Sequence, residues 1–142
     1  GRKTTGKNGA LPLKLLAEGK ELADKLAAAE PAAAQQLAQA IETAEQSIAR
    51  MVGYADRPAL AAAASNAYLQ QMGLTLGAIG LARAYLAAAA QAEDADGFGS
   101  GFYAAQQHNA RVYCAYVLPQ VYACAAQIEN AQALLDVPLE LY

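Results

Sequence analysis

The sequence predicts an all-α protein, folded as an antiparallel up-and-down bundle of four helices. Alanine makes up about a quarter of the 142 residues, and Val, Ile and Thr, which favour strands, are scarce. Apolar residues also recur at steps of three, four and seven along four segments, which is the spacing of one helix face. At this length a single domain around one core is expected.

The chain divides into three parts. Residues 1–10 are basic and rich in Gly and Thr, and they predict a linker from a preceding domain. Residues 11–136 form the helical domain, and 137–142 form a tail. Short connections favour antiparallel neighbours. The four helices are expected over residues 11–29, 31–52, 57–92 and 98–135.

The first two helices each carry one apolar stripe and one charged side. In the first, Leu15, Leu22 and Leu26 share the stripe. The second begins at Pro31, whose fixed backbone angle suits a first helical turn, and Gly53 can end it. These two helices are therefore expected to be packing partners of the central apolar stretch in a bundle.

The third helix contains the stretch 67–92, which is apolar all round and carries a single charge, Arg83. Such a helix is buried on several sides. Because Arg83 splits the apolar run, neither half reaches the length that a bilayer needs, and a membrane span is not expected. Arg83 lies on the apolar stripe, which predicts that it is buried and paired. The candidate partners of Arg83 are His108, Asn109, helix carbonyls and Glu30.

Three glycines in this helix, Gly73, Gly77 and Gly80, would each weaken an exposed helix by about 1 kcal/mol relative to Ala. They are therefore expected where a neighbouring helix comes close. In the fourth helix Pro119 stands in mid-pattern and removes a helical hydrogen bond. The stripe continues in phase on both sides of Pro119, which predicts a kink without a break.

Tyr113 is one of six tyrosines that could line a ligand groove, although filling the core is the preferred interpretation. Cys114 and Cys124 lie ten residues apart on one predicted helix, about 15 Å, too far for a disulfide. They are expected to be reduced, buried thiols, which is typical of a cytoplasmic protein.

Motifs for catalysis or for metal, phosphate or nucleic-acid binding are not found. His108, the only histidine, has no carboxylate or thiol one helical turn away and is interpreted as structural. Cys, His, Asp and Glu do not cluster at metal-ligand spacing. The net charge of -3 and its distribution do not resemble the basic surface of a nucleic-acid-binding protein. No catalytic, cofactor-binding or metal-binding residue is predicted. Structural roles are predicted for Arg83, Gly73, Gly77, Tyr113 and Pro119.

Several runs of residues resemble one family. These runs are residues 66–74, 81–84, 102–105, 110–113 and 117–120. Together they resemble the extra C-terminal helical domain of bacterial acyl-CoA dehydrogenases, in the branch similar to 3-methylmercaptopropionyl-CoA dehydrogenase. The resemblance covers about residues 1–135. The Gly-rich loop before Phe102 and the polar run that follows it depart from the family pattern.

The resemblance implies a parent enzyme that binds FAD and removes two hydrogens from the α and β carbons of an acyl-CoA thioester. The catalytic glutamate, the flavin and coenzyme A would belong mostly to preceding dehydrogenase domains. This chain would then be a structural and packing domain, inert by itself. The alternative is an autonomous helical adaptor that binds partner helices. A third hypothesis, an independent ligand-binding bundle, is supported only by the tyrosines.

Helix lengths predict an interface. The first two helices are about 30 Å long and the last two about 50 Å, so the longer pair is expected to project. Few charges occur over residues 58–135, so the projecting surface is expected to be apolar. The preceding domains would cover it, or a second copy in a homo-oligomer.

Overall fold

The computed structural model describes residues 9–94 and 100–136, with side chains for 9–92 and 101–136. The described residues form helices and no strand, which confirms the predicted all-α class. Most of the predicted linker, residues 95–99 of the Gly-rich loop before Phe102, and the tail lie outside the described residues. The elements are α2 (Ala10–Leu26), α3 (Pro31–Gly53), α4 (Pro58–Asp94), α5 (Ser100–Val112), the π-helix η1 (Tyr113–Val117), α6 (Gln120–Glu129) and α7 (Gln132–Leu135).

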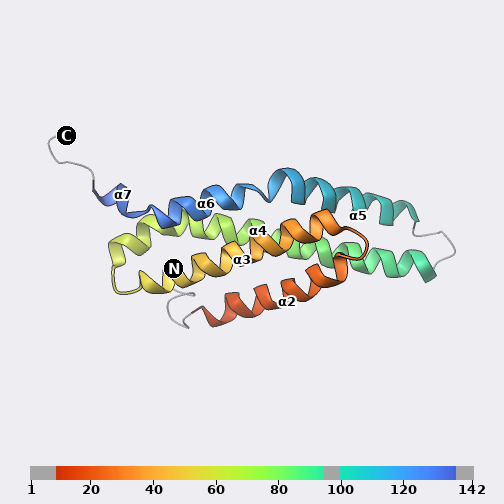
Figure 1. Cartoon of the computed structure of the whole chain (residues 1–142), viewed down its shortest axis with the longest axis horizontal. Helices are drawn as coiled ribbons and strands as arrows, with labels where there is room; N and C mark the ends of the chain where they lie inside the picture. The colour runs from red at the N-terminus through yellow and green to blue at the C-terminus, as the bar shows by residue number, and fades with distance from the viewer. Residues whose placement is uncertain (1–8, 95–99, 137–142) are drawn as a thin grey trace.

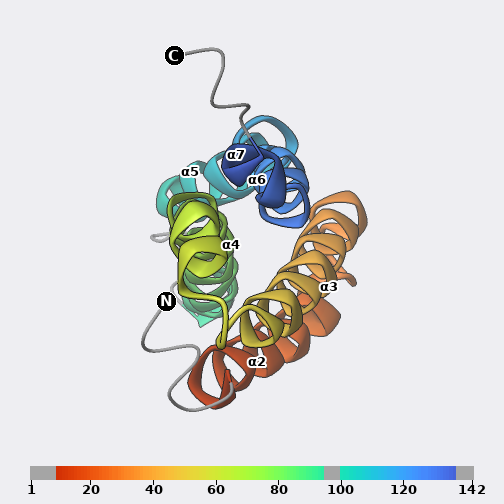
Figure 2. The ribbon, with the colours of Figure 1, turned by 90° about the vertical axis from the view of Figure 1, so that its left-hand side faces the viewer.

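The chain reverses direction at each connection between its long segments, as Figure 1 shows. Viewed end-on, the helices surround one core, with α2 and α3 on one side and α4 with α5 and α6 on the other (Figure 2). Helix α4 contacts α2, α3, α5 and α6, so it is the central element. Its far end and the start of α5 project beyond the corner between α2 and α3 (Figure 1).

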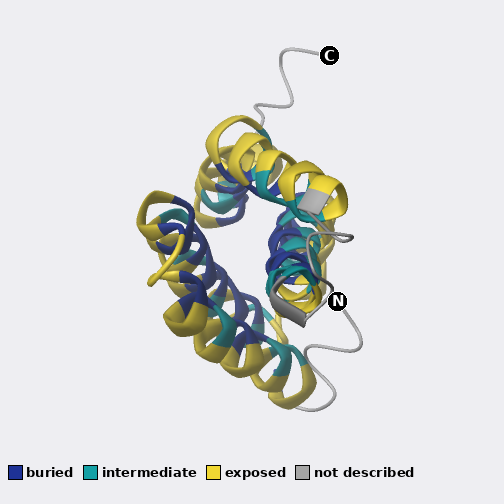
Figure 3. Cartoon of the chain, turned by 90° about the vertical axis from the view of Figure 1, so that its right-hand side faces the viewer, coloured by how far each residue is buried: buried dark blue, intermediate teal, exposed yellow. Residues whose placement is uncertain are grey.

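Buried residues line the inward sides of the helices and exposed residues the outward sides (Figure 3). The fully buried side chains include Leu37 and Ile41 of α3 and Tyr85 of α4. By length and composition alone, the described part of α4 is long and apolar enough to cross a membrane. In this structure 39% of its most apolar window is buried, because α4 packs among the other helices.

The start of α2 requires a glycine. Gly9 is buried with φ 77°, a left-handed conformation that side chains rarely adopt. A Cβ at this position would also lie 2.5 Å from Cγ2 of Ile48 in α3. Helix α2 ends at Leu26, three residues before the predicted end, and a turn then leads to Glu30 at the N-cap of α3.

The prediction of one continuous helix over residues 98–135 is wrong, because this part of the chain is divided into α5, η1, α6 and α7. In the π-helix η1 the backbone hydrogen bond joins residues five apart instead of four, so the N–H of Leu118 donates to the carbonyl of Tyr113 at 2.8 Å. Leu118 and Pro119 keep right-handed helical angles (φ -57°, ψ -35° and φ -57°, ψ -16°). A widened turn before Pro119 relieves the clash between its ring and the preceding turn, so the backbone stays helical there.

Candidate interaction face along helix α4

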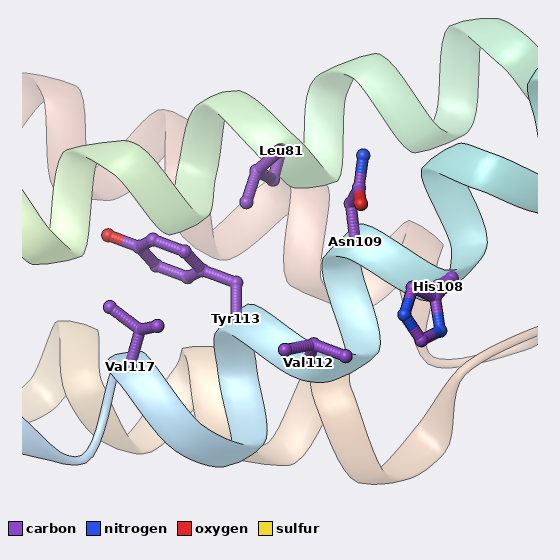
Figure 4. Close-up of a pocket in the computed structure, with 6 residues that line it drawn as sticks. All are labelled: Leu81, His108, Asn109, Val112, Tyr113 and Val117. Carbon is purple, nitrogen blue, oxygen red and sulfur yellow. The ribbon is translucent and has the colours of Figure 1, made fainter.

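A shallow groove of about 300 Å³ runs between α4 and the α5–η1 segment (Figure 4). We call it the α4–η1 groove. Val112 at its edge is 40% exposed, and Tyr116, one helical turn further on, is 80% exposed. The π-helix thus carries an exposed aromatic side chain next to residues that line the groove. Its lining residues are Leu81, His108, Asn109, Val112, Tyr113 and Val117.

Tyr113 joins η1 to α4. Its ring points toward α4 in Figure 4, and its hydroxyl donates a hydrogen bond to the carbonyl of Leu74 at 2.7 Å. A Cβ at Gly77 would lie 2.6 Å from that hydroxyl oxygen and 3.3 Å from Cζ. Burial raises the pKa of Tyr113. The absence of a side chain at Gly77 thus gives the Tyr113 hydroxyl the space to reach the α4 backbone.

The other two glycines of α4 differ from Gly77. Gly73 and Gly80 are exposed, and a Cβ at either would meet no atom within 4 Å. The expectation that a neighbouring helix comes close at these two positions is therefore wrong. Close approach also occurs at Gly19 of α2, where a Cβ would lie 2.5 Å from Cδ1 of Ile79.

The prediction that Arg83 is buried and paired is also wrong. Arg83 is exposed, and it makes no hydrogen bond or salt bridge with the part of the chain that the structure describes. The flanking residues Ala82 and Tyr85 are the ones that face the core. Because α4 is apolar on most sides, the sequence pattern could not tell which of its stripes faces inward.

Glu30 binds a different arginine, Arg111. The Glu30 carboxylate is 8% exposed and accepts from Arg111 at 2.8 to 3.0 Å and from Gln107 at 2.9 Å. Tyr85 lies 3.5 Å from the same carboxylate and 2.8 Å from the hydroxyl of Tyr103. The Tyr85 and Tyr103 rings are tilted, with centroids 5.4 Å apart. We call these five residues the Glu30 cluster.

Hydrogen bonding from Arg111 lowers the pKa of Glu30, against the opposing effect of burial. Burial, and then the contact with Tyr103, raises the pKa of Tyr85. The cluster therefore holds an ionised carboxylate beside the neutral phenol of Tyr85. The sequence suggested Glu30, His108 and Asn109 as candidate partners of Arg83, but it did not identify Arg111. A usable signal was the i,i+4 spacing of Gln107 and Arg111, which puts both on one helix side.

A second groove, of about 420 Å³, lies between α4 and the α6–α7 segment. Its residue Ala63 and Leu81 of the α4–η1 groove are 18 residues apart, about five helical turns, so both grooves open along the same side of α4. Leu134 at the second groove is 66% exposed. The lining residues of this second groove are Ala63, Asn66, Ala67, Gln127, Asn130, Ala133 and Leu134.

The side of the molecule formed by α2 and α3 is chemically different. A third groove, of about 450 Å³, lies there and carries four ionisable side chains. These are Lys20, Asp24, Glu42 and Glu45, and Lys20 pairs with Glu45 at 2.8 Å. In contrast, the two grooves along α4 contain no carboxylate, lysine or arginine among their lining residues. The two grooves along α4 are therefore neutral, whereas the groove on the α2–α3 side is charged.

Reactive groups for metal or thiol chemistry do not come together in the described residues. No group of three or more His, Cys, Asp or Glu side chains there could hold a metal ion. Cys114 and Cys124 are buried and free, as predicted. Burial raises the pKa of Cys114 to about 11, so its thiol is protonated at neutral pH.

Residues 15–138 match the family model described as acetyl-CoA dehydrogenase C-terminal like. No curated protein and no solved structure matches the chain.

Proposed function

Because the chain belongs to the acetyl-CoA dehydrogenase C-terminal-like family, we propose that it is the C-terminal structural and packing domain of an FAD-dependent acyl-CoA dehydrogenase. The parent enzyme would remove two hydrogens from the α and β carbons of an acyl-CoA thioester. We assign this parent to the branch similar to 3-methylmercaptopropionyl-CoA dehydrogenase and to the cytoplasm. The chain alone would be inactive.

The linings of the two grooves along α4 do not fit the pyrophosphate of FAD. Binding the pyrophosphate of FAD calls for basic side chains or a Gly-rich loop at a helix start, and the α4–η1 groove offers neither Lys nor Arg. The second groove along α4 has no basic residue either. We therefore assign FAD, the acyl-CoA substrate and the catalytic base to the preceding domains of the parent, and we place no reaction step in this chain.

The observation that carries the proposal is that the two grooves along α4 are neutral, whereas the groove on the α2–α3 side carries four ionisable side chains. The centres of protein interfaces are depleted of charge and enriched in aromatic residues, and Tyr116 is an exposed aromatic beside a neutral groove. We propose that the dehydrogenase domains of the same polypeptide dock on the α4–η1 groove. We further propose that the fold is an antiparallel four-helix bundle, in which α2 and α3 would then form the pair facing solvent.

A homo-oligomeric parent belongs to the same proposal. Phe102, at the start of α5, is 56% exposed on the end that projects beyond the α2–α3 corner (Figure 1). A second subunit of the parent would cover this end, since exposed aromatic residues of this size are typical of interface anchors.

The reading frame that encodes this chain gives the first test. We expect several hundred codons of dehydrogenase sequence upstream of Gly1. A start codon directly before Gly1 would overturn the proposal and favour an autonomous helical adaptor.

The protein gives the second test. The product of the whole frame should carry a flavin absorbance spectrum and reduce an artificial electron acceptor with an acyl-CoA. The 142-residue chain should do neither. Flavin binding by the 142-residue chain would contradict the assignment of FAD to the preceding domains.

A further inference from the structure

Helix α5 is the least anchored of the long helical segments. Among residues 101–112, whose side chains the structure describes, only Ala110 is buried. Helix α5 packs mainly on α4, whereas α6 packs on both α3 and α4 and buries Val121, Cys124 and Ile128. The two halves of this side of the fold therefore differ in how firmly they are held.

The Glu30 cluster is the tether that joins α5 to the opposite side of the fold. Arg111 and Gln107 of α5 both donate to the carboxylate of Glu30, at the corner between α2 and α3. Tyr103 of α5 is linked to the same carboxylate through Tyr85. A single buried carboxylate thus accepts from three side chains on two helices, and charge-assisted hydrogen bonds of this kind are the strong ones.

The segment that follows α5 has the properties of a hinge. Helix η1 interrupts the regular hydrogen-bond ladder directly after Val112, and π-turns of this type are frequent at functional sites. On its far side, Val121 and Leu118 are fully buried and fix the chain in the core. Backbone rearrangement in η1 can therefore move α5 without moving α6.

We propose that α5 is a hinged flap that pivots about η1 and is latched shut by Glu30. Opening would separate Arg111 and Gln107 from the Glu30 carboxylate and uncover the inner side of α4 around Tyr85. His108, Asn109 and Val112 move with α5, so the flap would reshape the α4–η1 groove. This last consequence rests on the proposed docking function, whereas the flap itself is a property of the chain alone.

Amide hydrogen exchange on the 142-residue chain, read by mass spectrometry for each helix, tests the flap. Glu30→Gln keeps the shape of the side chain and removes its charge. We expect exchange of residues 102–112 to rise about tenfold or more, while residues 120–129 keep their wild-type rates. Equal acceleration in both segments, or no change in 102–112, would overturn the proposal.

A matched control removes the exposed ion pair between α2 and α3. Glu45→Gln breaks the contact with Lys20, whose side chain is 52% exposed, and should leave exchange of residues 102–112 unchanged. If it accelerates 102–112 as much as Glu30→Gln does, the latch is not specific to Glu30.

If Glu30→Gln does not fold, native-state hydrogen exchange of the unmodified chain tests the flap instead. In low concentrations of urea, residues 102–112 should exchange through an opening that depends weakly on urea. Residues 120–129 should need global unfolding, with the full urea dependence. A common urea dependence for both segments would contradict the flap. Since this test needs no dehydrogenase domain, its failure leaves the docking proposal standing.

Discussion

Replacing the glycines of α4 by alanine should separate two effects that the sequence cannot distinguish. At Gly73 and Gly80 a new Cβ meets open space. Each substitution should raise the free energy of unfolding by about 0.5–1 kcal/mol, because glycine is a poor helix former. At Gly77 the same helical gain competes with a collision against Tyr113.

The magnitude at Gly77 follows from the geometry around Tyr113. With 2.6 Å between the new Cβ and the hydroxyl oxygen, the ring must move and its hydrogen bond to Leu74 is lost. The lost bond costs about 0.5–1.5 kcal/mol, and the overpacking costs about 1–3 kcal/mol. After the helical gain, Gly77→Ala should lower the free energy of unfolding by about 0.5–4 kcal/mol.

Urea unfolding followed by circular dichroism measures all three variants on the same chain. The decisive control is Gly77→Ala in the Tyr113→Phe background, where the closest atom has been removed. There the cost of the alanine should fall by at least half, giving a measurable coupling between the two positions. The reasoning is refuted if Gly77→Ala stabilises the chain as Gly73→Ala does, or if its cost is the same in both backgrounds.

The remaining predictions concern buried polar groups. Gln71 is fully buried, and neither atom of its side-chain amide has a hydrogen-bond partner among the described residues. Gln71→Met should therefore raise the free energy of unfolding, measured in urea, by about 1–3 kcal/mol. A lower free energy of unfolding would show that the amide is hydrogen-bonded. Glu30 faces Arg111 and Tyr85, and its pKa is lowered in the folded chain. The ionised carboxylate therefore contributes its full stabilisation above the ordinary pKa of 4.5, and this stabilisation is lost as the pH falls through the lowered pKa. Urea midpoints below pH 4.5 should therefore drop more steeply for the wild type than for Glu30→Gln, and parallel curves would contradict this. Burial raises the pKa of Cys114 from the ordinary thiol value of 9.0 to about 11. Its thiol should therefore react with a thiol reagent about a hundredfold more slowly in the folded chain than in urea. Equal rates in the two states would show that the thiol is accessible in the folded chain.

The sequence predicted the helices well because their signals are local. Pro31 marks the start of α3, and Gly53 is its last residue. The long apolar stretch was correctly placed at the centre of the fold, since a helix that is apolar all round has to be enclosed. These inferences need only the period of the pattern and the chemistry of the helix ends.

The errors have a common physical origin, which is that contact across the bundle depends on how each helix is rotated. The pattern of α4 did not reveal that Arg83 faces outward or that Gly77 differs from Gly73. The pair of Glu30 and Arg111 joins residues far apart in the chain, so no local pattern encodes it. Pro119 signalled a disturbance, but the π-helix lies before the proline and has no propensity signature of its own.

Hydroxyl-radical footprinting of Tyr116 is the most direct test of the central claim, which is that dehydrogenase domains dock on the α4–η1 groove. In the 142-residue chain at low concentration the side chain is 80% exposed and should be oxidised rapidly. Leu11 of α2, which is 52% exposed, serves as the internal reference on the charged side. In the product of the whole reading frame, oxidation of Tyr116 relative to Leu11 should fall several-fold. An unchanged ratio would contradict docking through this face, and protection that appears in the short chain only as its concentration rises would assign the face to a second copy.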